Sequence, residues 1–503
     1  LSGITTDLDG HTRFTDMPKT DTGNGDAPII DMGAYEAAPL LWLDKTADPT
    51  WDVPYHGTVT YTVVLSNVGG VSDAHILFTD TLPTHARFAA WIAAPPGTLR
   101  TEDDAENSVI TWSGALTAGH AISWTWTVIH TGDYGEEVIN TAEVSGTVQT
   151  GVDDAVFIVE EPDVLYVDED AAGETHDGLS WTTAYTNVQD ALDRTQAHSM
   201  YDYEIWVAEG VYTPDEGARH TADSEEESFT LSYNNVQLYG GFAGWESARD
   251  QRDWETHVTI LSGDIDGNDA NADGNHIAET WQVITGSNAN HVVWIDGVTH
   301  EKITAKTVID GFTITAGQAD GSPPHNSGGG LYCSGRHSGR GCSPTLTNLI
   351  FSGNQAAEDG GGMLNNGRDS DSNPVLTNLT LSGNQARYGG GMYNTGWDGV
   401  GSPSLINILL SGNHATRSGG GLYNVSVSNL PLTNVTLSGN QANEFGGGIL
   451  NSHSDLEMTN VIIWGNEAES DGRQLFNSQT TLVLISYTLI SEGENDINTS
   501  DTS

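Results

Sequence analysis

The chain of 503 residues carries 69 acidic against 17 basic residues, a formal net charge of −52, and 37% of its residues are hydrophobic. This hydrophobic content, with 14 Trp and 16 Tyr, excludes a wholly disordered chain, and the length predicts several domains or one long repeat array. The scarcity of Lys and Arg excludes a nucleic-acid partner, because phosphate groups are bound by clustered basic side chains, and no apolar run is long enough to enter a membrane as a helix.

The acidity has two compatible interpretations. One is secretion into cation-rich surroundings, where Ca²⁺ neutralises part of the carboxylates, and the other is solubility of the kind that halophilic proteins need. The chain begins at Leu1 without Met or a signal-peptide pattern, so we expect a processed chain or a segment of a longer one.

Three segments of the chain differ in composition. Residues 1–39 form a polar N-terminal extension that is rich in Gly and Asp and ends in APIIDMGAYEAAP. Residues 40–160 contain stretches such as GTVTYTVVLSNVG and AISWTWTVIHTG, which alternate apolar and polar residues between Gly, Asn and Pro turns. This period of two predicts an antiparallel β-sandwich. Pro162 marks the boundary to the third segment, residues 161–503.

The third segment opens with one predicted helix. In AYTNVQDALDRTQAH, Asn187 is a candidate N-cap, and Val188, Ala191 and Leu192 fall on one face. Short apolar stretches separated by Gly, Asn and Asp follow the helix, for example NVQLYGGF and TVIDGFTIT, and they predict short strands.

The stretch GDIDGNDANADGNH is the strongest chemical signal in the chain. Oxygen-bearing residues alternate along it, first as DxDxN and then as DxNxDG, a pattern that lets a short loop wrap a hard cation. The predicted Ca²⁺ ligands are Asp264, Asp266, Asn268, Asp269, Asn271 and Asp273. The closing Glu of an EF-type loop is missing, since Glu279 comes one position early, and the alternative is an ordinary turn. Weaker candidates are Asp7 with Asp9, and the set of Asp168, Asp170 and Asp177.

Two cysteines, Cys333 and Cys342, flank the stretch CSGRHSGRGC. They lack the CxxC spacing of a metal site. A disulfide that staples this loop fits an oxidising exterior, and the alternative is two free thiols.

Five similar phrases follow one another from Pro344 to Ser478. The asparagines of their SGN or WGN motifs are Asn354, Asn384, Asn413, Asn440 and Asn466, at spacings of 30, 29, 27 and 26 residues. A period of this length with short strands and no helix predicts a parallel β-solenoid with one coil per repeat. Leucine-rich repeats have a competing period, but their LxxLxLxxN phasing is absent.

The phrase LSGNQARYGGGMYN shows what each position is expected to do. Leu379 and Leu381 alternate with polar residues and therefore point into the bore of the solenoid. Gly383 and Asn384 make a corner, where Asn tolerates a left-handed backbone, and stacked asparagines form an amide ladder from coil to coil. The Gly triplet suits a bend where no Cβ fits. Two further asparagine columns recur in the same way: Asn348, Asn378, Asn407, Asn434 and Asn460, and Asn365, Asn394, Asn424, Asn451 and Asn477.

The repeat SGNQAxxxGGGM(Y/L)N resembles those of bacterial surface right-handed β-helix proteins, which include relatives of the chlamydial polymorphic outer-membrane proteins and the choice-of-anchor β-helix proteins. The stretches LYVDEDAAGETHDGLSWTTAYTNVQDALDR and EIWVAEGVYTP are similar to the family's first coil, where a helix caps the solenoid. The resemblance covers residues 164–490 and implies an all-β fold, a right-handed parallel β-helix with a capping helix.

Residues 41–148 resemble a second family, the tandem conserved-repeat domains of bacterial surface and cell-wall proteins. The residues that carry this resemblance are LDKTADPTWDVPYHGTVTYTVVLSNVG, FTDTLP and INTAEVSG. The resemblance implies an immunoglobulin-like sandwich that precedes the β-helix and serves as a spacer.

The N-terminal extension resembles the end of such a β-helix. The phrases TTDLDGHTRFTD and IIDMGAYE are similar to its last coils, whereas LVLISYTLISEGENDINTS near residue 500 resembles the coils just before that ending. Residues 1–36 are then either the end of an upstream repeat in a larger protein or a cap for the open coil of a neighbouring molecule. A strand edge without a partner invites such pairing, and a heterologous contact that does not close builds a filament.

The sequence favours no catalytic site. A lyase of the pectate or alginate type needs a basic residue beside acidic ligands, but the repeats contain no Lys, and Arg368, Arg387, Arg417 and Arg473 fall at variable or loop positions. The best lyase-like candidates are Arg336, His337 and Arg340 in the cysteine loop. The adjacent pairs Asp103–Asp104 and Asp153–Asp154 are interpreted as loop acids rather than hydrolase carboxylates, and His414 as a surface variant of the repeat Gln.

We therefore expect an extracellular, cell-surface structural protein that binds Ca²⁺ and assembles with itself head to tail. Three alternatives stay open. The first is an adhesin for surface polysaccharide that does not polymerise, with Tyr388, Tyr393, Trp397 and Tyr423 as an aromatic shelf. The second is a polysaccharide lyase, and the third is a displayed passenger of a larger anchored protein.

Overall fold

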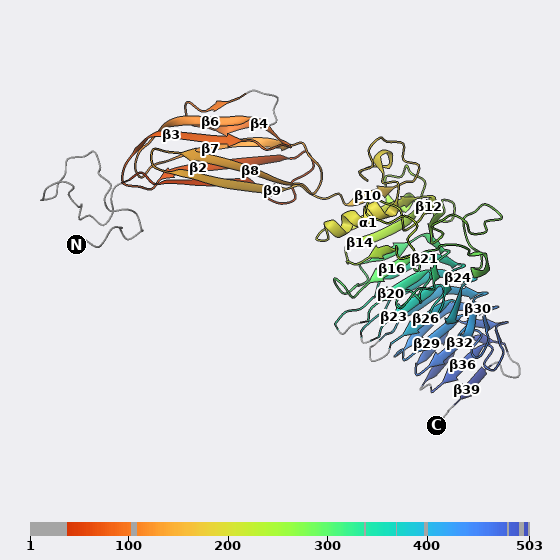
Figure 1. The fold of residues 1–503 in the computed structure, drawn as a ribbon. Coiled ribbons are helices and arrows are strands. Elements are labelled where there is room, and N and C mark those ends of the chain that lie inside the picture. The colour runs from red at the N-terminus through yellow and green to blue at the C-terminus, as the bar shows by residue number, and fades with distance from the viewer. Residues whose placement is uncertain are drawn as a thin grey trace, which may run out of the picture. The chain divides into compact units, whose positions relative to one another are not determined.

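The computed structural model describes residues 38–101, 108–336, 339–368, 370–396, 401–479, 482–491 and 497–500. The chain divides between Glu161 and Pro162 into two compact units (Figure 1). Within the described residues, no helix has both the length and the apolar character needed to span a membrane.

The first unit consists of two antiparallel sheets. The four-stranded sheet has the order β1 (Leu41–Asp48), β2 (Thr58–Asn67), β7 (Ala121–His130) and β4 (Ala86–Ala93). The five-stranded sheet has the order β5 (Leu99–Arg100), β6 (Val109–Leu116), β3 (Asp73–Thr81), β8 (Glu137–Ser145) and β9 (Thr150–Ile158). Alternate side chains of both sheets point inward and share one core, so the unit is a β-sandwich. Trp124 and Trp126 of β7 are completely buried there, and Trp124 stacks on Phe78 of β3.

The second unit contains three parallel sheets among its described residues. The largest follows the order β10 (Val164–Val167), β11 (Tyr203–Ala208), β14 (Val236–Phe242), β17 (Val308–Asp310), β21 (Thr345–Ser352), β24 (Val375–Ser382), β27 (Ser404–Ser411), β30 (Leu430–Ser438), β33 (Leu456–Thr459) and β37 (Val483–Ser486). Five strands pair beside this path: β12 (Gly210–Tyr212), β15 (Thr259–Ser262), β18 (Phe312–Thr315), β34 (Ile462–Trp464) and β38 (Leu489–Ile490).

The other two sheets complete the coils. One contains β13 (Phe229–Leu231), β16 (Val293–Asp296), β20 (Leu331–Ser334), β23 (Met363–Asn366), β26 (Met392–Thr395), β29 (Leu422–Val425), β32 (Ile449–Ser452), β36 (Leu475–Ser478) and β39 (Ile497–Ser500). The other contains β19 (Gln318–Ala319), β22 (Gln355–Ala356), β25 (Gln385–Tyr388), β28 (His414–Ser418), β31 (Gln441–Ala442) and β35 (Glu467–Ala468). Figure 1 shows the strands stacked in coil order from β10 to β39. The predicted all-β fold with a parallel β-solenoid is confirmed.

Equivalent residues of successive coils lie in register. Leu381 of β24 pairs with Phe351 in the coil before it and with Leu410 in the coil after it. Leu379 and Leu381 are buried in the bore, as their alternation with polar residues predicts. Because every coil contributes the same inward positions, one continuous hydrophobic core runs through the unit.

Helix α1 (Val188–Ala197) covers the first coils. Asn187 is its N-cap and accepts a hydrogen bond from the backbone N–H of Asp190, as predicted. Val188, Ala191 and Leu192 are buried and belong to the same core as the bore. The remaining helical turns are the 3₁₀ segments η1 (Trp181–Thr183), η2 (Arg249–Gln251) and η3 (Trp281–Val283).

Candidate functional site

A buried asparagine ladder runs along the repeated coils. The side-chain Nδ2 of Asn354 donates to Oδ1 of Asn384 at 3.0 Å, and the pattern continues through Asn413 and Asn440 to Asn466 at 2.8–2.9 Å. The same Oδ1 atoms also accept the backbone N–H of the preceding coil's asparagine. All five side chains are buried. Each side chain therefore joins two coils at a place where water cannot supply the bonds.

A second asparagine column lies on the surface and runs in the opposite sense. Asn378 donates to Asn348, Asn407 to Asn378 and Asn434 to Asn407, at 2.9–3.1 Å, so the later coil donates to the earlier one. These residues have positive φ values, for example 58° at Asn378. At the buried corner it is Gly383, with φ 62°, rather than Asn384 that adopts the left-handed backbone. The sequence analysis placed this conformation one residue too late.

The third asparagine column is also buried but is joined differently. Asn394 donates to Oδ1 of Asn424 at 2.9 Å, whereas Asn365 and Asn451 donate to backbone carbonyls of Ser372 and Ser454. These amides tie strands of the sheet to the loops that follow them. The third column therefore holds loops against the sheet and does not form a continuous ladder of side-chain hydrogen bonds.

The Gly triplet brings successive coils into backbone contact. Gly389 has a positive φ of 65°, and a Cβ on Gly390 would lie 2.4 Å from the carbonyl oxygen of His414 in the next coil. A Cβ on Gly391 would lie 2.6 Å from the carbonyl oxygen of Gly421. The N–H groups of Gly390 and Gly391 donate to carbonyls of the next coil's triplet at 3.1 Å. The triplet thus has the structural role that its repetition predicts.

Three tyrosines gather on the outer side of the coils, next to the triplets. Tyr393 of β26 and Tyr423 of β29 pack edge to face at 5.1 Å, and Tyr388 lies 5.6 Å from Tyr423. Arg417 donates a 2.7 Å hydrogen bond to the hydroxyl of Tyr388, and Arg387 lies 5.3 Å from the Tyr388 ring centroid. All three rings are half-buried against one another, so they form a packed cluster rather than an open shelf. Trp397, the fourth predicted member, lies outside the described residues.

Asp359 is a half-buried carboxylate beside this tyrosine cluster. It was not among the residues predicted from the sequence. Its residue forms a β-bridge with Tyr388. Burial raises the pKa of Asp359 to about 6; the negative charge of Glu358 adds to this effect and Arg387 opposes it. Burial likewise raises the pKa of Tyr393 and Tyr423, with the charge of Asp359 contributing. The only sequence signal was an acid at a position where the next three repeats carry Tyr, Ser and Phe, although the fifth carries Asp471.

The predicted Ca²⁺ loop is divided into two turns. In the first turn, Asp264 accepts the backbone N–H groups of Asn268 and Asp269 at 3.0 and 3.2 Å. Asp266 accepts the Asn268 side chain at 2.6 Å and the Ser287 N–H at 2.9 Å. In the second turn, Oδ1 of Asn271 accepts the N–H of His276 at 3.1 Å. The carboxylates are thus engaged by nearby backbone and side-chain donors, largely within their own loop.

Only part of the six predicted ligands lies together. Asp269 joins the first turn, where it accepts the Thr285 N–H at 2.5 Å and the Asn288 side chain at 2.9 Å. Burial raises the pKa of Asp269 to about 6, and Asp264 adds to the shift. Asp273 belongs to the second turn and accepts the Asn275 side chain at 2.9 Å. Across the described ranges, no group of three or more His, Cys, Asp or Glu side chains is arranged to hold a metal ion, so calcium stays a prediction.

The weaker calcium candidates are local turns where the structure describes them. Asp168 accepts the N–H of Asp170 and Asp177 accepts that of Leu179, both at 3.0 Å. Asp7 and Asp9 lie outside the described residues.

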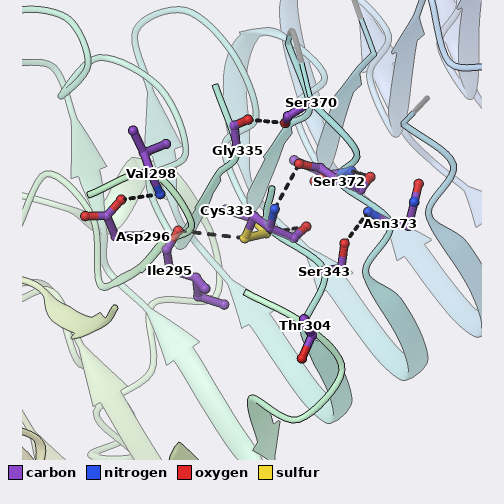
Figure 2. The surroundings of a disulfide bond; sticks show 12 residues. Ile295, Asp296, Val298, Thr304, Cys333, Gly335, Ser343, Ser370, Ser372 and Asn373 are labelled. Carbon is purple, nitrogen blue, oxygen red and sulfur yellow. Dashed lines mark hydrogen bonds between the residues drawn. A yellow bond between two sulfur atoms is a disulfide. The ribbon is translucent and has the colours of Figure 1, made fainter. Parts of the chain in front are cut away.

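Cys333 and Cys342 form a disulfide with a Cα–Cα distance of 5.7 Å (Figure 2). Both cysteines are completely buried and belong to the core of the bore. The N–H of Cys342 donates to Oγ of Ser372 at 3.1 Å, and Ser370 in the same loop donates to the carbonyl of Gly335. The bond is therefore packed inside the coil, whereas the sequence analysis expected a staple in a loop.

Three of the basic residues considered for lyase chemistry form ion pairs or hydrogen bonds through their side chains. Arg387 pairs with Glu358 at 2.9 Å, and Arg417 pairs with Glu444 at 2.9 Å. Arg340 donates to the carbonyl oxygen of His300. His337 and the pair Asp103–Asp104 fall outside the described residues, Asp153 accepts the N–H of Lys45 at 2.6 Å, and the ring of His414 stacks with Trp281 at 6.2 Å.

The last described coil exposes its inward positions. Ile485 of β37 is 53% exposed, whereas Met458, its partner in β33, is completely buried. Ile497 of β39 is 49% exposed, against 1% for its partner Leu475 in β36. Tyr487 is 92% exposed. Among the described strands, β37, β38 and β39 each pair on one side only.

Comparison with protein families finds one match. Residues 407–425, which contain the SGN and GGG motifs of one coil, match the Chlamydia polymorphic membrane protein repeat. With the long parallel sheets, this match supports a surface β-helix-like protein. None of the curated proteins matches the chain.

Three of the solved structures that match are distant from this chain. The full-length major pilin SpaD from Corynebacterium diphtheriae is 15% identical over 26% of this chain and 38% of the pilin, with a TM-score of 0.20. AvmM, which catalyses macrocyclization in alchivemycin A biosynthesis, is 10% identical over 26% of this chain and 93% of AvmM, with a TM-score of 0.17. A family 123 glycoside hydrolase from Clostridium perfringens is 9% identical over 25% of this chain and 30% of the enzyme, at 0.16. These TM-scores are too low to bear on fold or function.

Proposed function

We propose that the chain is an extracellular structural protein of a bacterial surface, a β-helical rod whose copies join head to tail. Along the described coils, strand pairing and the asparagine ladders join each coil to its neighbours, as a rod requires. The match to a polymorphic membrane protein repeat supports the surface location. The first unit fits the spacer role that its resemblance to immunoglobulin-like surface repeats implies.

The open last coil is the observation that carries this proposal. Buried apolar side chains stabilise a protein by roughly 25 cal/mol per Å² removed from water, and this coil leaves the inward-facing Ile485 and Ile497 about half exposed. A further coil placed on it would bury these side chains and pair three strand edges at once. Residues 1–36, whose sequence resembles the end of a β-helix, supply that coil from a second copy.

Assembly is tested with the full chain and with a chain that lacks residues 1–36. In sedimentation velocity, the full chain is expected to form a concentration-dependent series of oligomers, and the shortened chain to stay monomeric. Added peptide 1–36 should bind the shortened chain and stop growth of the full chain. Monomers of the full chain at high concentration would overturn the proposal, and so would oligomers that persist without residues 1–36.

A substitution at the last described coil distinguishes a specific head-to-tail contact from non-specific association. Ile485→Asp places a charge on the exposed edge and is expected to abolish assembly. Ile350→Asp is the matched control, because Ile350 is 44% exposed on the outside of a central coil and should leave assembly intact. Equal loss in both variants would point to non-specific association.

Glycan binding is the second candidate, favoured by the tyrosine cluster. Stacking on aromatic rings and bonds to charged groups are common means of holding sugars, and Tyr393, Tyr423 and Arg417 combine both. The rings are half-buried, so only part of each is open to a ligand. Binding of surface polysaccharide by a chain that stays monomeric, and loss of that binding in Tyr423→Ala, would favour an adhesin over a polymer.

A further inference from the structure

A lysine and an aspartate meet in the hydrophobic core of the β-sandwich. Lys45 lies on β1 of the four-stranded sheet and Asp80 on β3 of the five-stranded sheet, and both side chains are completely buried. Nζ of Lys45 lies 2.5 Å from Oδ2 of Asp80. Burying two charges away from water is costly unless further hydrogen bonds satisfy both groups. Oδ1 of Asp80 has no such partner.

Asn140 of β8 completes a triad at the same place. Asp80 pairs with Ala142 across β3 and β8, so Asn140, two residues away on the same face, is its diagonal neighbour. The Asn140 amide is close enough to the carboxyl of Asp80 to lower the pKa of Asp80. The side chain is completely buried, and neither of its polar atoms has a hydrogen-bond partner of regular geometry. Such unsatisfied buried amides are rare and call for an explanation.

The surroundings of the triad favour the neutral forms of its acid and base. The Tyr61 ring lies 5.2 Å and the Trp126 ring 5.9 Å from Nζ of Lys45, and both rings are completely buried. Burial lowers the pKa of Lys45 to about 8, although the charge of Asp80 opposes this shift. Burial also raises the pKa of Asp80, against the effect of Lys45. An uncharged amine is a nucleophile and an uncharged carboxyl is an acid.

We propose that Lys45 and Asn140 become joined by an intramolecular amide bond between Nζ and Cγ, with Asp80 carrying the protons. A proton moves from Lys45 to Asp80, and the free Nζ attacks Cγ of Asn140 while Asp80 protonates Oδ1. Asp80 then takes a proton from Nζ and passes it to Nδ2. The Cγ–Nδ2 bond breaks and one ammonia leaves. The Oδ1–H proton returns to Asp80 as the carbonyl re-forms, so Asp80 ends protonated and holds the proton that Lys45 gave up. The reaction needs no cofactor or oxidant.

The position of the bond suits a chain that is pulled from its two ends. β1 is the first strand of the sandwich and β8 the last but one, and the two belong to different sheets. A bond from Lys45 to Asn140 connects these strands directly, so a pulling force passes through it and residues 46–139 are not extended. This inference does not depend on head-to-tail assembly, because any stretched spacer benefits in the same way.

Mass spectrometry of the purified full chain tests the bond. The intact mass is expected to be lower than the sequence mass by one ammonia, and a protease digest should contain one branched peptide that joins the Lys45 and Asn140 segments. A succinimide at any Asn also loses one ammonia, but it takes up water at alkaline pH, whereas the amide bond stays. Folded protein that yields only separate, unmodified Lys45 and Asn140 peptides would overturn the proposal.

Variants assign the roles within the triad. Asn140→Ala and the paired change Lys45→Met with Asp80→Asn, which leaves no lone buried charge, should restore the sequence mass and remove the branched peptide. Asp80→Asn alone should keep both partners but lose most of the bond. Lys302→Met is the matched control, since Lys302 is exposed in the other unit, and it should keep the full ammonia loss. A branched peptide that persists in Asp80→Asn would remove Asp80 from the reaction.

Discussion

The two asparagine columns show how burial decides what the same side chain contributes. Asn413 and Asn407 belong to one coil, and each exchanges side-chain hydrogen bonds with the coils before and after it. Asn413 is completely buried, whereas Asn407 is exposed. Water can replace the bonds of Asn407 but not those of Asn413, so the two positions should respond very differently to substitution.

Asn413→Ala is therefore expected to destabilise the β-helix by about 2–5 kcal/mol, because it leaves the N–H of Asn384 and the carbonyl of Leu381 without partners. The matched control is Asn407→Gly, which keeps the positive φ of 58° at that position and should cost less than about 1 kcal/mol. Denaturant unfolding followed by circular dichroism measures both. Equal costs would show that the buried ladder has no special role.

The raised pKa of Asp359 predicts how the stability of the folded chain depends on pH. Its pKa is about 6 in the folded chain, against an ordinary value of 3.8. Between these values the folded chain holds a proton that the unfolded chain has released, so the contribution of Asp359 to stability falls as pH rises through that window. Asp359→Asn removes this loss and should raise the free energy of unfolding by about 1–3 kcal/mol at pH 7, with no gain below pH 4.

The comparison for Asp359 must allow for the net charge of −52, since removing any carboxylate reduces repulsion. Asp320→Asn, at an exposed position of the same unit, controls for that general effect. Denaturation series at several pH values give the result. A gain that is equal in the two variants would rule out a particular role for the buried carboxyl.

At the scale of the element, the glycine triplets set how closely the coils stack. Gly390→Ala places a Cβ 2.4 Å from a backbone oxygen of the next coil and should cost about 3 kcal/mol, because neither backbone can retreat without breaking strand pairs. Gly412→Ala meets no atom within 4 Å but has a φ of 62°, so its cost is strain alone, about 1–2 kcal/mol. Thermal unfolding orders the two variants. A larger effect at Gly412 would show that conformation, rather than close approach, explains the triplet.

The elements that the sequence predicted are those that depend on local pattern. Residues close together in the chain are enough to predict the repeat spacing, the inward leucines Leu379 and Leu381 and the N-cap Asn187. Because the coils repeat, a prediction made for one coil applies to the others. The left-handed residue was misplaced from Gly383 to Asn384 because both types tolerate that backbone. Burial of the disulfide was missed because a polar stretch, SGRHSGRG, lies between two cysteines that face the bore.

The triad of Lys45, Asp80 and Asn140 could not be predicted from the sequence pattern. The three residues sit on strands β1, β3 and β8, and only the packing of one sheet on the other brings β1 against the face of β3 and β8. In the sequence, each is a polar residue within an alternating stretch, where a solvent-facing position is the ordinary expectation. An open coil, in contrast, was expected from the sequence, because LVLISYTLISEGENDINTS resembles the coils just before the end of a β-helix.

At the scale of the whole molecule, the charge of −52 sets how cations act on the chain. Like charges repel one another throughout the folded chain, so any salt stabilises it by screening, and the screening length falls from about 10 Å at 0.1 M to about 3 Å at 1 M. Calcium does this more strongly than sodium even without a binding site. A calcium site is therefore revealed only by an effect that exceeds screening and depends on particular residues.

The turn of Asp264 and Asp269 is where such an effect is expected. Burial raises the pKa of both carboxyls, and repulsion from Asp266 adds to the shift of each. A bound cation would relieve that repulsion. If Ca²⁺ binds there, a concentration of 100 times Kd adds about 2.7 kcal/mol to the free energy of unfolding. The melting temperature of the β-helix should then rise with Ca²⁺ at constant ionic strength, and chelator should reverse the rise.

Asp264→Asn combined with Asp269→Asn should abolish that rise, because the amides keep the size of the carboxylates without their charge. Glu225→Gln with Glu226→Gln removes two charges from an exposed turn of the same unit and serves as the control. If the melting temperature of both double variants still rises with Ca²⁺, calcium acts elsewhere or by screening. Asp264 and Asp269 then serve only to accept the hydrogen bonds that hold the turn. If only the first loses it, the loop closes on the cation, and the same bonds orient the carboxylates toward it.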